Sequence, residues 1–189
     1  MTPEALSGGF ADAPVQSAHA FRAALEALSR PATIHSLHGA TPPEPLSVAA
    51  GVLILTLCDA TIPVHLAGDH DCPALRDWIT FHCGAPLVAA QEASFAVGRW
   101  EALQPVARFA IGQPDYPDRA ATLIVEMPEL SSEGPRLRGP GIDGVATLSL
   151  PESAAFIANR GLFPLGFDCF LTAGASVAGL PRSTRVEDV

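Results

Sequence analysis

The sequence predicts a single α/β domain over residues 14–189, built on a mixed sheet and preceded by a flexible arm over residues 1–13. Two patterns predict this fold class. Segments with a helical spacing of apolar residues alternate along the chain with short apolar segments typical of strands, as in layered α/β domains. Near the C-terminus, two apolar segments flank a short glycine turn, which predicts an antiparallel pair and therefore a mixed sheet.

The first element after the arm is expected to be a helix. Phe21, Leu25 and Leu28 recur at helical spacing, and Pro31 ends the segment because proline cannot continue a helix. We expect this apolar side of the helix to face the core.

The middle of the chain continues the alternation. Residues 46–59 are apolar all round, which suits a helix buried between layers. A well-marked helix follows, with Pro73 in its first turn and Gly84 as its C-terminal stop. Short strands are expected over residues 33–37, 63–66, 94–97 and 121–127.

The last third contains a predicted loop, a helix and a hairpin. The prolines of QPDYPD, residues 113–118, indicate a loop, and residues 136–150 are glycine-rich and then alternate as strands do. Pro151 opens a helix that Gly161 ends. Residues 167–180 are expected to form a hairpin around a central Ala-Gly-Ala turn.

Composition excludes several classes of partner. The net charge is −9 and the sequence pI is about 5.0, so nucleic acid is not an expected partner, because neutralising phosphates needs a basic face. The longest apolar run, residues 48–57, has about half the length of a membrane span, so it indicates a buried helix.

The cysteines and the start of the chain bear on its compartment. Four cysteines without a CxxC pair, and a start that lacks a secretory signal, predict a reduced, cytoplasmic protein.

All 11 basic residues are arginines, so the chain has no lysine. Chemistry that needs a lysine amine is therefore excluded within this chain. That chemistry includes the Schiff base that anchors pyridoxal phosphate and the phosphate-binding lysine of a P-loop.

Two short patterns carry weak signals. Residues 139–144 fit GxGxxG, but a strand-like segment follows them instead of a helix, which favours a tight turn over a dinucleotide site. His70, Cys72 and His82 are ligand types for zinc, and a stand-alone small-molecule or metal-dependent enzyme built on them is our alternative hypothesis. Their spacing matches no standard zinc pattern, so a helix cap and a partly buried histidine form the simpler interpretation.

The arginines are the remaining candidates. Guanidinium groups suit planar, bidentate recognition of phosphate or carboxylate, which makes Arg22, Arg182 and Arg185 of interest. The competing interpretation is an exposed pair near the C-terminus and a surface residue on the first helix.

Several short motifs, in order and spacing, make the chain resemble the PhnH family of the bacterial carbon–phosphorus lyase system. The matching stretches cover residues from about 10 to 187. They include FR at 21–22, LILTLCD at 53–59, FH at 81–82, FAV at 95–97, ATLI at 121–124, LRGPGI at 137–142, FPLG at 163–166 and LPRSTRV at 180–186.

The resemblance implies a three-layer fold similar to pyridoxal-phosphate-dependent transferases, but without that cofactor, and the absence of lysine agrees with this. It also implies a homodimer or a core-complex subunit that assembles with PhnG, PhnI, PhnJ and, as a further candidate, PhnL. The complex makes α-D-ribose 1-methylphosphonate 5-triphosphate from ATP and methylphosphonate, with ATP entering only as a substrate of the complex. This subunit is then non-catalytic or contributes residues to a shared site.

Polar residues inside the matching motifs are the candidate ligand or partner contacts. Arginines in this set could hold phosphate oxygens, and the histidine could move a proton near neutral pH. The competing view is that the aspartates cap elements and the others pair internally. The set is Arg22, Asp59, His82, Asp168, Arg182 and Arg185.

Overall fold

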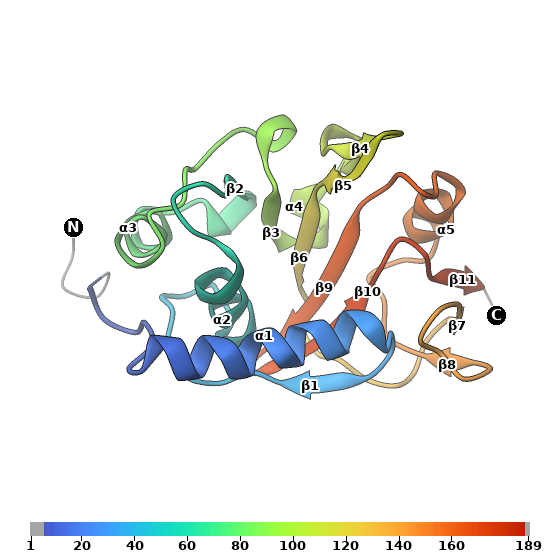
Figure 1. Cartoon of the computed structure of the whole chain (residues 1–189), viewed down its shortest axis with the longest axis horizontal. Coiled ribbons are helices and arrows are strands. Elements are labelled where there is room, and N and C mark those ends of the chain that lie inside the picture. The colour runs from blue at the N-terminus through green and yellow to red at the C-terminus, as the bar shows by residue number, and fades with distance from the viewer. Residues whose placement is uncertain (1–5, 188–189) are drawn as a thin grey trace.

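The computed structural model describes residues 6–187 and is centred on a six-stranded mixed sheet (Figure 1). The strand order is β1-β10-β9-β6-β3-β2. Strands β2, β3, β6 and β9 are parallel, whereas β10 is antiparallel to both β9 and β1. The strands are β1 (Ile34–Ser36), β2 (Val64–Leu66), β3 (Phe95–Arg99), β6 (Thr122–Glu126), β9 (Asp168–Ala173) and β10 (Ser176–Leu180).

Successive residues of the central strands point to opposite faces of the sheet, so each strand contributes to two cores. On β6, Ile124 packs with the helices α1 (Ala13–Ser29), α2 (Val48–Leu57) and α3 (Pro73–His82). Its neighbours Leu123 and Val125 belong to the other core.

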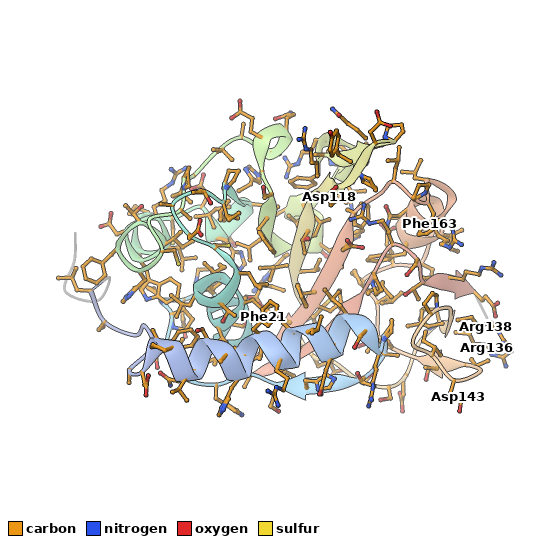
Figure 2. The ribbon with its side chains drawn as sticks, viewed as in Figure 1. Phe21, Asp118, Arg136, Arg138, Asp143 and Phe163 are labelled. Carbon is orange, nitrogen blue, oxygen red and sulfur yellow. The ribbon has the colours of Figure 1, made fainter. Side chains whose placement is uncertain are left out.

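The second core is covered by smaller elements. These are α4 (Trp100–Leu103), α5 (Ala154–Gly161) and an antiparallel sheet of β11 (Arg185–Glu187), β7 (Arg136–Arg138) and β8 (Ala146–Thr147). The central sheet therefore lies between two layers. Figure 2 shows Arg136, Arg138 and Asp143 near the small sheet, at the end of the molecule opposite the start of α1.

Most predicted elements are confirmed. The helix α2 is buried along most of its length, as its uniform apolarity predicts. Strands β9 and β10 form the predicted hairpin, with Ala173 paired to Ser176 and a two-residue turn between them. The carbonyls of this turn are held from outside the hairpin: Gly174 accepts a hydrogen bond from Ala49 N at 2.9 Å, and Ala175 accepts one from Leu37 N at 2.8 Å.

The predicted orientation of the first helix is wrong. The buried residues of α1 are alanines, Ala20, Ala24 and Ala27, whereas Phe21 and Leu25 are 53% and 56% exposed. Figure 2 labels Phe21 on this helix. Gly179 of β10 explains the reversal. A Cβ at this position would lie 2.5 Å from the Ala27 carbonyl, so the helix and the strand approach too closely for large side chains.

Three other segments can be compared with their predictions. The predicted loop at residues 113–118 is wrong except at its centre, because only Pro114 and Asp115 form a turn and the other residues belong to a hairpin of β4 (Ile111–Gln113) and β5 (Tyr116–Ala120). Arg185 belongs to β11 and is not part of a free tail, although its side chain is exposed. Residues 139–144 form the predicted turn between β7 and β8.

The predicted arm lies partly against the body of the protein. Trp78 Nε1 donates a hydrogen bond to the Ser7 carbonyl at 3.0 Å, and Thr41 N donates one to the Gly8 carbonyl at 2.8 Å. Phe10 packs against the helical core. The arm's flexibility stays a prediction, and its residues 1–5 lie outside the described residues. Between residues 6 and 187, no helix has the length and apolarity that crossing a membrane requires.

Candidate functional site

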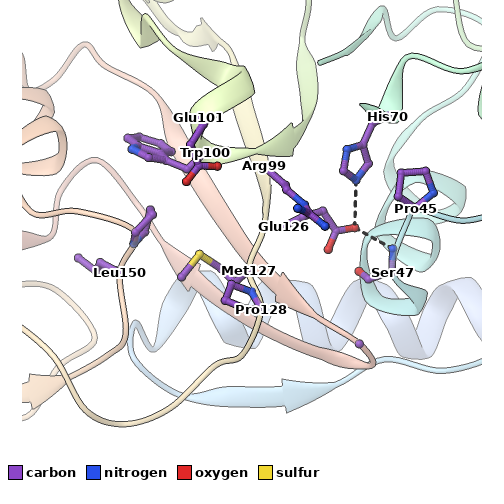
Figure 3. A pocket seen from close by; sticks show the side chains of 12 residues that line it. Pro45, Ser47, His70, Arg99, Trp100, Glu101, Glu126, Met127, Pro128 and Leu150 are labelled. Carbon is purple, nitrogen blue, oxygen red and sulfur yellow. Dashed lines mark hydrogen bonds and ion pairs between the residues drawn. The ribbon is translucent and has the colours of Figure 1, made fainter. Parts of the chain in front are cut away.

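The four parallel strands end at a single pocket. Its cavity volume is about 650 Å³. His70 follows β2, Arg99 ends β3, Glu126 ends β6 and Gly174 follows β9, and all four line the pocket (Figure 3). Ligands of open α/β sheets commonly bind outside the carboxyl ends of the strands, so this is where a site is expected.

Glu126 is held in place by the first turn of α2. Ser47 caps this helix, accepting a hydrogen bond from Ala50 N through its hydroxyl, while its own N–H donates to Glu126 Oε1 at 2.7 Å. Thr172 Oγ1 donates to Glu126 Oε2 at 3.2 Å. A carboxylate beside a helix N-terminus is favourably placed with respect to the helix dipole.

Burial nevertheless dominates the titration of Glu126. Its side chain is 9% exposed, and removal from water raises its pKa above the ordinary value of 4.5. The hydrogen bonds from Ser47 and Thr172 and the charge of Arg99 act in the opposite direction but do not outweigh burial. The carboxyl group is therefore easier to protonate than an exposed glutamate.

His70 faces this carboxyl group. Its side chain is 2% exposed, and Nε2 lies 3.9 Å from Glu126 Oε1. Within the described residues, Nε2 is a buried nitrogen without a hydrogen-bond partner. Burial lowers the pKa of His70, and the positive charge of Arg99 lowers it further, so the neutral imidazole is favoured.

The rest of the pocket combines one exposed cation with apolar walls. Arg99 is exposed, and its side chain converges with those of His70 and Glu126 (Figure 3). On the far side, the Trp100 ring stacks on Phe156 with centroids 5.1 Å apart, which fixes that wall. The other lining residues are Pro45, Ser47, Glu101, Met127, Pro128, Leu150 and Pro151.

Two of the predicted site residues meet elsewhere. Asp168 begins β9, and Arg182 follows β10, so both lie at the edge of the sheet opposite the pocket. Arg182 Nε and Nη2 donate to the Asp168 carboxylate, and Nη1 donates to the Pro117 carbonyl at 2.7 Å. The backbone N–H of Arg182 donates to the same carboxylate at 2.8 Å. This geometry fits the internal-pair interpretation, while a ligand contact stays a prediction.

The other predicted contacts are dispersed. Arg22 is exposed on α1, and Arg185 is exposed on β11. Asp59 lies in a turn, where its Oδ1 accepts hydrogen bonds from the N–H and hydroxyl of Thr61, both at 2.7 Å. His82 ends α3, and its ring contacts the rings of Trp78 and Phe81.

The residues of the metal hypothesis are not gathered into one site. His70 points into the pocket, Cys72 precedes α3 as its N-cap residue, and His82 Nε2 lies 3.2 Å from the Ser7 carbonyl. Among residues 6–187, no group of three His, Cys, Asp or Glu side chains is arranged to hold a metal ion.

Sequence reasoning missed Arg99 and Glu126. Each is the polar last residue of a short apolar strand, in FAVGR and TLIVE. The signal that could have identified them is their common position, because the carboxyl ends of parallel strands meet at one edge of the sheet.

Comparison with known proteins adds independent information. The chain matches the family model described as "Bacterial phosphonate metabolism protein (PhnH)" over residues 8–187. It is also 39% identical, over 190 aligned residues, to the alpha-D-ribose 1-methylphosphonate 5-triphosphate synthase subunit PhnH of Rhizobium meliloti (strain 1021). That alignment covers 96% of this chain and 95% of the relative. The chain therefore belongs to the PhnH family.

Proposed function

We propose that this chain is a subunit of an α-D-ribose 1-methylphosphonate 5-triphosphate synthase and supports formation of that product from ATP and methylphosphonate in phosphonate catabolism. The observation that carries the proposal is the 39% identity to a synthase subunit across nearly the full length of both chains. Similarity over both whole chains favours a shared role more strongly than a shared fold alone would.

Within such a complex, the chain contributes a ligand pocket. The support is the convergence of His70, Arg99 and Glu126 at the carboxyl ends of the parallel strands, in a cavity large enough for a small metabolite. The protein is then a site-contributing subunit and not only a scaffold.

The finer expectations form part of the same proposal. The partners are PhnG, PhnI, PhnJ and also PhnL, the subunit forms a homodimer when alone, and the complex is cytoplasmic. The fold is a variant of the pyridoxal-phosphate-dependent transferase fold that works without this cofactor. The mixed sheet between two layers and the lysine-free sequence support this last point.

Co-expression with PhnG, PhnI and PhnJ from the same source tests the subunit role. We expect the chain to co-purify with them through size-exclusion chromatography. Elution of the chain by itself under all conditions would contradict the subunit role.

Growth on methylphosphonate as sole phosphorus source tests the pocket. A strain lacking the gene is complemented with the wild-type chain, with Glu126→Gln or with Glu92→Gln, an exposed glutamate outside the pocket. We expect lost growth only for Glu126→Gln, with the complex still assembled. Normal growth of the strain that carries Glu126→Gln would contradict a role for the pocket and would favour a purely structural role for the chain.

A further inference from the structure

The pocket contains a buried nitrogen, Nε2 of His70, that has no hydrogen-bond partner within the described residues. Buried polar atoms in folded proteins are almost always hydrogen-bonded, because a buried atom without a partner has lost its hydrogen bonds to water and gained none in return. His70 Nε2 is buried and unpartnered within the described residues, and its distance of 3.9 Å to Glu126 Oε1 is too long for a hydrogen bond. A ligand group that lies beside both atoms could form a hydrogen bond with each of them.

The chemistry of the two groups limits what that third group is. A neutral imidazole nitrogen either donates or accepts one hydrogen bond, and a carboxylate accepts. An alcohol hydroxyl fits both groups in either arrangement of protons. It donates to an ionised Glu126 while it accepts from Nε2–H of His70, or it accepts from a protonated Glu126 while it donates to an unprotonated Nε2. A phosphate oxygen only accepts and would be repelled by an ionised Glu126. An ammonium group could donate to both groups, but the positive charge of Arg99 acts on both His70 and Glu126 and disfavours a second cation beside them.

Arg99 supplies the complementary charge in the same pocket. Its side chain is exposed at the cavity, and within residues 6–187 it forms no hydrogen bond or ion pair. A guanidinium group is suited to phosphate oxygens, which it binds through two parallel N–H donors. The acidic side chain of Glu101 lines the same cavity, so Arg99 can serve a single anionic group but does not create a broadly basic surface.

The apolar walls suit the carbon skeleton between these two groups. Trp100, Met127 and Leu150 line the cavity opposite His70 (Figure 3). Ligand pockets typically combine such walls with a few convergent polar groups, and a volume of about 650 Å³ lies within their usual range.

We infer that this pocket binds a phosphorylated sugar, with a sugar hydroxyl held by His70 and Glu126 and a phosphate oxygen held by Arg99. The choice of a sugar among hydroxyl-bearing phosphates rests on the proposed function, because the relative is named for a ribose phosphonate triphosphate product.

Isothermal titration calorimetry of the full chain with ribose 5-phosphate tests the inference. Ribose and inorganic phosphate, titrated separately, each offer only half of the interaction. We expect ribose 5-phosphate to bind at least about tenfold more tightly than either, since each lacks one set of charge-assisted or hydroxyl hydrogen bonds.

Variants assign the contacts. Arg99→Gln is expected to weaken ribose 5-phosphate binding by about ten- to a hundred-fold, and His70→Asn to remove the preference for ribose 5-phosphate over inorganic phosphate. Arg22→Gln is the matched control, because Arg22 is also an exposed arginine but lies outside this cavity. Thermal melting confirms that each variant is folded. If His70→Asn does not fold, the inference is tested by the effect of Arg99→Gln on binding of ribose 5-phosphate, ribose and inorganic phosphate.

Three results would overturn the inference: no saturable binding of ribose 5-phosphate, binding unaffected by Arg99→Gln, or equal loss with Arg22→Gln. Failure here is distinct from failure of the proposed function. A chain that co-purifies with its partners but binds no sugar phosphate loses only the ligand assignment, and a chain that binds the ligand but never assembles loses only the subunit role.

Discussion

Removing the Arg182 side chain should destabilise the protein far more than removing an exposed arginine. In Arg182→Met, the Asp168 carboxylate, 23% exposed, loses the guanidinium that neutralises it and keeps only the backbone N–H of residue 182. The Pro117 carbonyl also loses its donor. Breaking a buried ion pair from one side costs about 3–5 kcal/mol, and the partial exposure of this pair lowers our expectation to about 2–4 kcal/mol.

Arg76→Met is the matched control, because Arg76 also pairs with an aspartate through two guanidinium nitrogens. Its partner is Asp71, and the two side chains are 52% and 38% exposed, compared with 13% for Arg182. Exposed pairs contribute about 0–1 kcal/mol, so the control should stay below about 1 kcal/mol.

Urea denaturation followed by circular dichroism measures both free energies of unfolding. In a thermal melt of a domain of this size, the Arg182 variant should lose about 4–16 °C, at about 2–4 °C per kcal/mol. The double variant Asp168→Asn/Arg182→Met should regain part of the loss, since it removes the uncompensated carboxylate. Equal losses for Arg182→Met and Arg76→Met would refute the reasoning, and would return Arg182 to the set of free ligand contacts.

Three further predictions follow from other sites. Because the pKa of Glu126 is raised in the folded state, the contribution of this group to stability is present below the ordinary value of 4.5 and is lost as pH rises through the folded pKa. The free energy of unfolding of Glu126→Gln, relative to wild type, should therefore increase from acid to neutral pH in urea titrations, and a pH-independent difference would contradict this. Gly179→Ala should cost about 1–3 kcal/mol because its Cβ would collide with the α1 backbone, whereas Gly161→Ala, with no atom within 4 Å of its Cβ, should cost nothing measurable; similar melting of the two variants would argue against close packing. Asn159→Ala should lower the free energy of unfolding by about 2–4 kcal/mol, because the buried Asn159 side chain donates to the Phe167 carbonyl at 2.8 Å and accepts from the Phe167 N–H at 2.9 Å. A loss below about 1 kcal/mol in denaturant would show that water replaces both hydrogen bonds.

The sequence predicted those elements whose pattern has one dominant cause. The uniform apolarity of residues 48–57 and the glycine turn within residues 167–180 predicted a buried helix and a hairpin, and both are present. The orientation of α1 was not predictable from its own residues. Spacing alone favours burying Phe21 and Leu25, but the close approach of β10 at Gly179 admits only alanines, and that approach depends on a strand about 150 residues away. Prolines concealed the β4–β5 hairpin, although proline is tolerated on edge strands, and both strands of this two-stranded sheet are edge strands.

The pocket depends on strand order, which no local pattern encodes. The sequence drew attention to His70 only as a candidate metal ligand, and it gave no sign that His70 lies beside Glu126. Glu126 and Arg99 resemble ordinary strand ends until β3 and β6 are known to be parallel neighbours. The family motifs led instead to Asp168 and Arg182, which lie at the opposite edge of the sheet.

The turn between β9 and β10 links parts of the chain that are far apart in sequence. Its two carbonyls hold the amides of Ala49 at the start of α2 and Leu37 just after β1, and Gly174 also lines the pocket. Each of these amide hydrogens is protected while its hydrogen bond to the turn is intact. We expect the turn to separate from both partners as one cooperative opening unit, so that the two amides show matched protection factors in deuterium. A ligand that rests on the turn would slow both, and so would report pocket occupancy from backbone positions that never touch it.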